Sequence, residues 1–167
     1  MKKSVTAMVA LACALAGGQI QAASFAAKPK ANLVVVSKSD RMLYAYAASG
    51  ELLLEAGIGI GDNAIGDKTR RGDKKTPEGT YKLDARKPDS SFYKAIHVSY
   101  PTAEQAAAAR KKGLDPGGDI LIHGPRKTGD GLADLDDSTD GCVQASVEDM
   151  DVLWEIVVLG ARIEIMP

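Results

Sequence analysis

The sequence predicts an α+β fold, mainly β, built on a β-sandwich with two helices. Short apolar or alternating segments, separated by polar turns, follow one another from residue 33 to residue 99, which is typical of strands. Helical patterns occur only later, at residues 102–112 and 147–158. The chain has no internal repeat, so these segments are expected to share one core.

The first two predicted strands, residues 33–36 and 42–46, are joined by the polar turn 37–41 and form a hairpin. The Gly- and Asp-rich loop 61–75 is long enough to be functional. The other extended segments are, in chain order, residues 51–59, 80–83 after the turn 76–79, 95–99, 119–124 and 161–166.

Both predicted helices carry start signals. The alanine-rich segment 102–112 follows Pro101 and ends at Gly113. The second helix is capped by Ser146, with Asp149 three residues later as an approximate capping box. Its apolar residues recur at helical spacing and predict a face in the core: Val147, Met150, Leu153, Trp154 and Val157.

The N-terminus predicts export. Residues 1–23 combine Lys2 and Lys3, an apolar run and a small-residue end, as a cleaved signal peptide does. The apolar run is shorter than the roughly 20 residues that span a bilayer. In the segment Ala10-Leu11-Ala12-Cys13, the leucine stands one position away from where a lipoprotein signal would place it, so Cys13 is not expected to carry a lipid. We therefore expect a periplasmic or exported protein, with residues 24–31 as a linker and residues 32–167 as one domain.

The charge balance argues against a nucleic-acid-binding protein. Removing Lys2 and Lys3 leaves 19 basic against 22 acidic residues, and the sequence has no basic patch that would bind nucleic acid. Cys142 is then the only cysteine, so no intramolecular disulfide forms. We expect a monomer stabilised by packing.

The chemistry centres on His123 and Cys142. His123 ends an apolar strand, where a lone histidine is more often a core residue. Eighteen residues separate His123 from Cys142, enough for the intervening loop to bring Cys142 back beside it. An imidazole within hydrogen-bonding reach makes the thiolate the dominant nucleophile. Gly141 permits a turn in which the N–H groups of Gly141 and Cys142 point at a developing oxyanion.

The motif His123-Gly124, followed by Thr139-Asp140-Gly141-Cys142, resembles the L,D-transpeptidase catalytic domain of the YkuD family. The segment Thr76-Pro77-Glu78-Gly79-Thr80-Tyr81 is similar to a further family motif, and Asp115-Pro116-Gly117-Gly118-Asp119 to the segment before the family's histidine. The resemblance extends from about Leu33 to Met166 and implies an L,D-transpeptidase-like β-sandwich.

The resemblance implies that the cysteine attacks the bond before the terminal D-alanine of a peptidoglycan tetrapeptide stem. The resulting thioester passes to an amine of another stem, giving a 3–3 cross-link, or to an envelope protein. It implies Cys142 as nucleophile, His123 as base and then acid, Gly124 as the carbonyl that orients the imidazole, and Gly141 as an oxyanion donor. It implies no metal or cofactor.

Substrate-binding candidates are Arg126, Thr139, Asp140 and Gln144. Two of them depart from the family: Asp140 stands where histidine is frequent, and Gln144 where arginine or asparagine is frequent. Asp140 would raise the thiol pKa, so its carboxylate is expected to point toward His123, Arg126 or solvent.

Arg70 and Arg71 are weaker candidates for stem carboxylates, and His97 is expected to be structural or at the surface. A metal site that combines His123 and Cys142 with Asp134, Asp136, Asp137 or Asp140 lacks ligand spacing. Two alternatives to a transpeptidase stay open: a cysteine L,D-carboxypeptidase or amidase that acts on the same stems, and a non-catalytic wall-binding domain.

Overall fold

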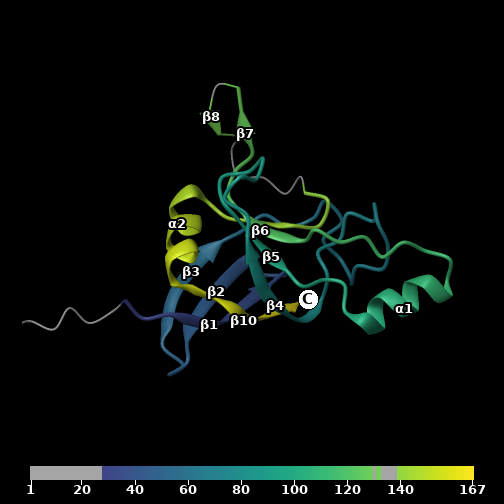
Figure 1. The fold of residues 1–167 in the computed structure, drawn as a ribbon, viewed down its shortest axis with the longest axis horizontal. Helices are drawn as coiled ribbons and strands as arrows, with labels where there is room; N and C mark the ends of the chain where they lie inside the picture. Colours follow the sequence, from purple (N-terminus) through teal and green to yellow (C-terminus); the bar gives the residue numbers. More distant parts are fainter. Residues whose placement is uncertain (1–27, 130, 133–138) are drawn as a thin grey trace, which may run out of the picture.

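The computed structural model describes residues 28–129, 131–132 and 139–167 (Figure 1). The predicted signal peptide, residues 1–23, and most of the predicted linker 24–31 lie outside the described residues. Ala31, the last residue of that linker, already belongs to the first strand. Neither helix of the described part of the chain has the length and hydropathy needed to cross a bilayer.

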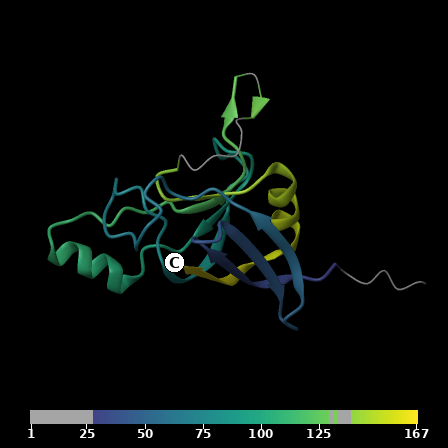
Figure 2. The same ribbon diagram turned by 180° about the vertical axis from the view of Figure 1, so that it is seen from behind.

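The mostly β fold with two helices is confirmed. Eight strands form one curled sheet in the order β3-β2-β1-β10-β4-β5-β6-β9, and β7 and β8 form a small projecting hairpin (Figures 1 and 2). The strands are β1 (Ala31–Ser37), β2 (Met42–Ala47), β3 (Leu52–Gly57), β4 (Gly79–Arg86), β5 (Ala95–Val98), β6 (Leu121–His123), β7 (Lys127–Thr128), β8 (Gly131–Leu132), β9 (Val143–Gln144) and β10 (Val157–Met166).

The predicted hairpin of β1 and β2 forms because its apolar positions alternate. Val34 and Val36 lie in the core and pair with Ala45 and Leu43, which are also buried. On its other edge β1 pairs in parallel with β10, so the C-terminal strand lies in the middle of the sheet. One continuous core lies inside the curl of the sheet.

Both helix starts agree with the sequence. Helix α1 (Ala103–Lys111) has Thr102 as its N-cap in a full capping box with Gln105. It stands away from the sheet in both views, and Ala109 is its buried residue (Figures 1 and 2). Helix α2 (Val147–Ile156) begins at Ser146, whose hydroxyl accepts a hydrogen bond from the Asp149 N–H at 3.0 Å.

Helix α2 ends two residues earlier than predicted, and β10 begins at once with Val157. The guanidinium of Arg86 donates hydrogen bonds to the carbonyls of Trp154, at 2.9 Å, and Val157, at 2.7 Å. It thereby satisfies carbonyls that a longer helix would have bonded itself. Val157 and Val158 are also β-branched, which favours a strand.

The predicted apolar face of α2 is only partly in the core. Met150 and Leu153 are fully buried, whereas Trp154 packs against the core from its edge and Val147 is half-buried. The core therefore depends on the middle of the helix more than on its ends.

We expect Leu153→Ala to lower the free energy of unfolding by about 2–5 kcal/mol, because it leaves a cavity in a fully packed site. Val152→Ala in the same helix is the matched control, since Val152 is 38% exposed. Denaturant unfolding of both variants measures the difference. Equal losses for the two variants would contradict the packing of α2 described above.

Loop 61–75 lacks regular structure but is anchored within the loop and across its two ends. The nearly fully buried Lys38 Nζ donates to the Gly66 carbonyl, within the loop, at 2.9 Å and to Glu78 Oε1, beyond it, at 2.7 Å. The buried Thr76 hydroxyl accepts from the Gly61 N–H at 3.0 Å and so joins the two ends of the loop. These contacts hold the loop against the sheet, where it forms one wall of the cavity described next.

Candidate active site

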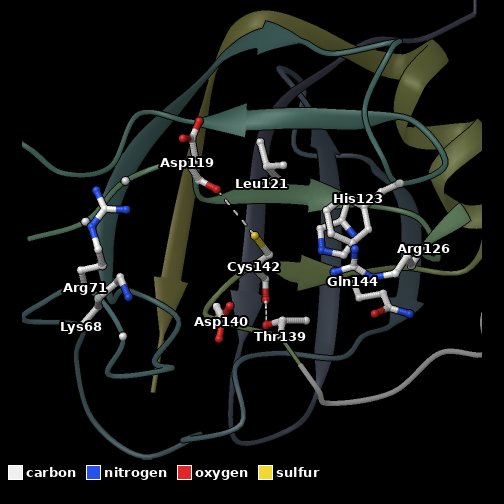
Figure 3. A pocket seen from close by; sticks show the side chains of 14 residues that line it. Lys68, Arg71, Asp119, Leu121, His123, Arg126, Thr139, Asp140, Cys142 and Gln144 are labelled. Carbon is white, nitrogen blue, oxygen red and sulfur yellow. Dashed lines mark hydrogen bonds between the residues drawn. The ribbon is translucent and has the colours of Figure 1, made fainter.

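A cavity of about 630 Å³ opens over β6 and β9 at the edge of the sheet (Figure 3). Cavities of this size are typical of ligand sites. Loop 61–75, Phe92 and the segment 117–121 supply part of its lining. Of the residues singled out in the sequence, those that line it are Arg71, His123, Arg126, Thr139, Asp140, Cys142 and Gln144.

The register of β6 and β9 brings His123 and Cys142 to one face. The two strands are parallel, with Ile122 opposite Val143 and His123 opposite Gln144. Ile122 and Val143 point into the core and are fully buried. Because side chains alternate along a strand, His123 and Cys142 point the other way, into the cavity.

His123 is held by two contacts. Its Nδ1 lies 2.7 Å from the Gly124 carbonyl, which can only accept, so Nδ1 carries the proton and Nε2 keeps its lone pair in the neutral ring. Phe92 stacks on the imidazole with ring centroids 3.8 Å apart. Burial lowers the pKa of His123, the Gly124 hydrogen bond opposes this, and Arg126 lowers it further. His123 is therefore a neutral base at pH 7.

Gly124 lies at a close approach of two chain segments. A Cβ atom at this position would lie 2.5 Å from the Tyr93 carbonyl oxygen, which accepts a hydrogen bond from the Gly124 N–H. Only glycine fits there without moving the backbone that orients the imidazole.

Cys142 is a free, partly exposed thiol whose Sγ donates to the Asp119 carbonyl at 3.7 Å. Burial raises the pKa of this thiol, and the Leu121 N–H opposes the shift. Asp140 and Asp119 raise the pKa further, while Lys68 lowers it. Both shifts favour the uncharged forms of the thiol and the imidazole at rest, and the hydrogen bond of Sγ goes to the Asp119 carbonyl and not to the His123 ring.

We expect the rate of Cys142 alkylation by iodoacetamide to be low at pH 7 and to rise only above the ordinary range of a thiol pKa, because burial disfavours the thiolate. The His123 pKa is lowered, so any His123-dependent reaction should lose rate only as pH falls below about 6.5. N-acetylcysteine is the reference thiol. Faster alkylation of Cys142 than of this reference at pH 6–7 would contradict the neutral pair.

The turn before Cys142 is held by Thr139. Its hydroxyl donates to the Cys142 carbonyl at 2.9 Å and accepts from the Gly141 N–H at 3.2 Å. The Gly141 N–H, which the resemblance assigns to oxyanion binding, is thus engaged in this structure by Thr139. Of the two N–H groups expected to bind an oxyanion, those of Gly141 and Cys142, the Cys142 N–H is the one that Thr139 does not engage.

Cationic side chains stand at both ends of the cavity (Figure 3). On one side of Cys142, Lys68 pairs with Asp73 at 2.8 Å, and Arg71 pairs with Asp115 at 2.6 Å. On the other side, the Arg126 guanidinium lies 4.9 Å from the Phe92 ring centroid, next to the His123 stack. An elongated anionic ligand would meet a positive charge at each end.

Asp140 is exposed, which agrees with solvent, one of the three directions expected for its carboxylate. Figure 3 shows it on the side of Cys142 away from His123 and Arg126. Gln144 lines the cavity and is nearly buried, and its backbone pairs with Gly59.

Several other candidates lie elsewhere. Arg70 is exposed and does not line the cavity. His97 pairs with Asp84 at 2.6 Å on the surface of β4 and β5. Asp134, Asp136 and Asp137, considered above as metal ligands, lie outside the described residues.

The sequence assigned no site role to three residues that line the cavity, Lys68, Phe92 and Asp119, although Asp119 belongs to the segment similar to the one before the family's histidine. Lys68 stands in a polar loop and Phe92 in an isolated β-bridge with Arg126, so no periodic pattern marks either residue. Asp119 has a φ of 54°, which turns its carbonyl toward the thiol. The Asp-Pro-Gly-Gly-Asp run before β6 was the available signal for an irregular backbone there.

Comparison with known proteins places this geometry in context. The protein named "Putative L,D-transpeptidase YafK" from Escherichia coli (strain K12) is 35% identical over 96 residues, which are 54% of this chain and 37% of YafK. The helical cell shape determining protein Pgp2 from Campylobacter jejuni (K307A mutant) superposes with a TM-score of 0.65 at 26% identity, over 83% of this chain and 47% of that one.

An L,D-transpeptidase from Xylanimonas cellulosilytica shares the fold with a TM-score of 0.54 at 16% identity, over 83% of this chain and 61% of that one. The chain spans less than two thirds of each of these three relatives. The sequence profile of the L,D-transpeptidase catalytic domain matches residues 31–165. With nearly all of the described sheet inside that match, the chain belongs to the YkuD family of L,D-transpeptidase catalytic domains.

Proposed function

We propose that this domain is a cysteine L,D-transpeptidase of peptidoglycan that releases D-alanine from a tetrapeptide stem and transfers the acyl group to an amine. The observation that carries the proposal is the placement of His123 at the end of β6 and of Cys142 directly before the adjacent parallel strand β9, both facing one cavity. A thiol and an imidazole in this arrangement serve nucleophilic acyl transfer.

In the first step the Cys142 Sγ attacks the carbonyl carbon of the bond before D-alanine. Because the resting pair is neutral, His123 Nε2 takes the thiol proton as the C–S bond forms. The Cys142 N–H stabilises the oxyanion, and the turn that Thr139 holds fixes the direction of this N–H.

In the second step the C–N bond breaks, and the protonated His123 gives its proton to the departing amine of D-alanine. A thioester remains on Cys142. An incoming amine, from another stem or from an envelope protein, then attacks the thioester carbonyl and loses a proton to His123. The C–S bond breaks as the acyl group passes to the amine, and His123 returns the proton to the Cys142 Sγ. The hydrogen bond to Gly124 holds the same ring edge toward the reacting atoms throughout.

The site of action that fits this substrate is outside the cytoplasmic membrane. The predicted signal peptide at residues 1–23 supports export, and the catalytic unit is then residues 32–167. The likeness to Pgp2, a cell shape determining protein, supports a role in the shape of the cell wall.

The test is mass spectrometry of products after the protein is incubated with purified disaccharide-tetrapeptide, with Cys142→Ala as the control. Dimers that form with loss of D-alanine, only with the parent protein, are the expected result. Cysteine-dependent tripeptide monomers without dimers would assign an L,D-carboxypeptidase instead. No product on this substrate would overturn the proposal and turn attention to amide bonds between stems and proteins, or to binding alone.

A further inference from the structure

A short segment before β5 places both the His123 ring and the carbonyl that orients it. Phe92 stacks on the imidazole with ring centroids 3.8 Å apart. The next residue, Tyr93, makes two main-chain hydrogen bonds: its carbonyl accepts from the Gly124 N–H at 2.9 Å, and its N–H donates to the Pro125 carbonyl at 2.8 Å. The imidazole and the peptide group whose oxygen holds its Nδ1 therefore depend on the same few residues.

Asp151 ties this segment to helix α2. One carboxylate oxygen, Oδ1, accepts hydrogen bonds from the Tyr93 hydroxyl, at 2.8 Å, and from the Lys94 ammonium. Lys94 has a φ of 46°, a backbone conformation that a residue other than glycine keeps only where its surroundings hold it. Its ammonium also lies 5.2 Å from the Tyr93 ring centroid and 5.9 Å from that of Trp154. A single carboxylate thus holds two consecutive side chains of the segment.

The position of Asp151 separates its effect from substrate binding and from stability. Asp151 does not line the cavity, so it does not touch a ligand there. The hydrogen bonds from Lys94 and Tyr93 lower its pKa, so Asp151 is a carboxylate at neutral pH. Its side chain is 47% exposed, and ion pairs that are this exposed add little to stability. Its main effect is therefore expected on the geometry of the segment that it holds.

We propose that Asp151 is a positioning residue for His123. By fixing Tyr93 and Lys94, it keeps the Gly124 carbonyl against Nδ1. The proton of the neutral ring then stays on Nδ1 and the lone pair on Nε2, which is the tautomer that a base for the thiol needs. The inference rests on the proposed function for the use of this base, whereas the placement of the ring is testable without a substrate.

The first test reads the tautomer of His123 from the ¹⁵N shifts of its ring at about pH 8, where the imidazole is neutral. The chain has two histidines, so His97→Gln assigns the signals. We expect the proton on Nδ1 in the parent protein and a mixture of both tautomers in Asp151→Ala. Glu155→Ala is the matched control, because it removes the same charge from the same helix and its partner Lys28 is exposed. An Asp151→Ala protein with the parent tautomer would overturn the inference.

The second test is the rate of Cys142 acylation by disaccharide-tetrapeptide, followed by intact mass spectrometry. Asp151→Ala should lower this rate by about tenfold or more, since small displacements of a reacting group cost much of the rate. Asp151→Asn should lower it less, because its amide oxygen can still accept from the Tyr93 hydroxyl. Glu155→Ala should keep the parent rate. A merely structural role would lower the free energy of unfolding and leave the rate of the folded protein unchanged, and that result would overturn the inference.

A double-mutant cycle tests the route from Asp151 to the ring. In a Tyr93→Phe, Lys94→Met background both partners of the carboxylate are gone, so Asp151→Ala should cause no further loss of rate. The same tenfold loss in that background would overturn the route. Lys94→Met alone breaks the ion pair from its other side and supplies the comparison if Asp151→Ala does not fold.

The outcomes keep the inference apart from the proposed function. If the parent protein forms no thioester, the proposed function fails, and the tautomer comparison still decides whether Asp151 places the ring. If the parent acylates while Asp151→Ala matches Glu155→Ala in tautomer and in rate, the inference fails and the transpeptidase proposal stands.

Discussion

Replacing His123 with glutamine is expected to lower the rate of thioester formation by about 10²–10⁴-fold with the fold intact. Glutamine is a polar side chain of similar size that can still donate to the Gly124 carbonyl, so the packing against Phe92 is changed little. It cannot take a proton near neutral pH. Since the Cys142 thiol is neutral at rest, it then has no base to remove its proton as it attacks.

The measurement is the appearance of the acylated protein by intact mass spectrometry after mixing with disaccharide-tetrapeptide. His97→Gln is the matched control, because the other histidine of the chain lies outside the cavity and pairs with Asp84. The acid limb of the pH profile should disappear in the His123 variant, since the group that titrates there is gone. A His123→Gln protein that acylates within fivefold of the parent would remove His123 from the role of base.

The sequence predicted those parts of the structure that local physics decides. The alternation at Val34 and Val36 and the caps at Thr102 and Ser146 depend on neighbours within a few residues, and the structure agrees with each of them. His123 and Cys142 were recognised as a pair because motif spacing carries information that local patterns do not. His123 and Cys142 face the same side of the sheet because of the register between β6 and β9, and the sequence does not specify that register.

The remaining features depend on contacts between distant segments. The end of α2 is set by Arg86, which comes from β4, about 70 residues earlier in the chain. Lys68 can be buried because Asp73 neutralises its charge and three backbone N–H groups hold Asp73 in place. No local pattern in the sequence distinguishes Lys68 from the exposed Arg70. The raised pKa of Cys142 likewise follows from burial, which the sequence cannot give for a residue in the turn before β9.

The second large effect is expected from Gly141→Ala, which should damage both stability and catalysis. Gly141 has a φ of +126°, a conformation that disfavours any L side chain. The added Cβ would also lie 2.4 Å from the backbone oxygen of Lys75, an atom that cannot rotate away as a side chain does. Strain of about 1–3 kcal/mol and a steric cost of about 1–3 kcal/mol should therefore combine in the free energy of unfolding.

The catalytic loss follows from the position of Gly141. The backbone must shift either at Gly141 or at Lys75 to relieve the contact, and Gly141 is bonded directly to Cys142. A shift there would move the Sγ away from His123 and turn the Cys142 N–H away from the oxyanion, and small displacements of this kind cost much of the rate. Intact mass spectrometry of thioester formation and denaturant unfolding measure the two effects.

Gly50→Ala separates the two causes. Gly50 also has a positive φ, +87°, but an added Cβ would meet no atom within 4 Å, and the residue does not line the cavity. This variant should show the cost of the backbone conformation alone, about 1–2 kcal/mol, with the acylation rate unchanged. If Gly141→Ala loses no more stability than Gly50→Ala and acylates at the parent rate, the packing of loop 61–75 against the Cys142 turn does not hold the nucleophile in place. If it loses much more of both, the close contact between Gly141 and Lys75 is what couples the long loop to the reactive thiol.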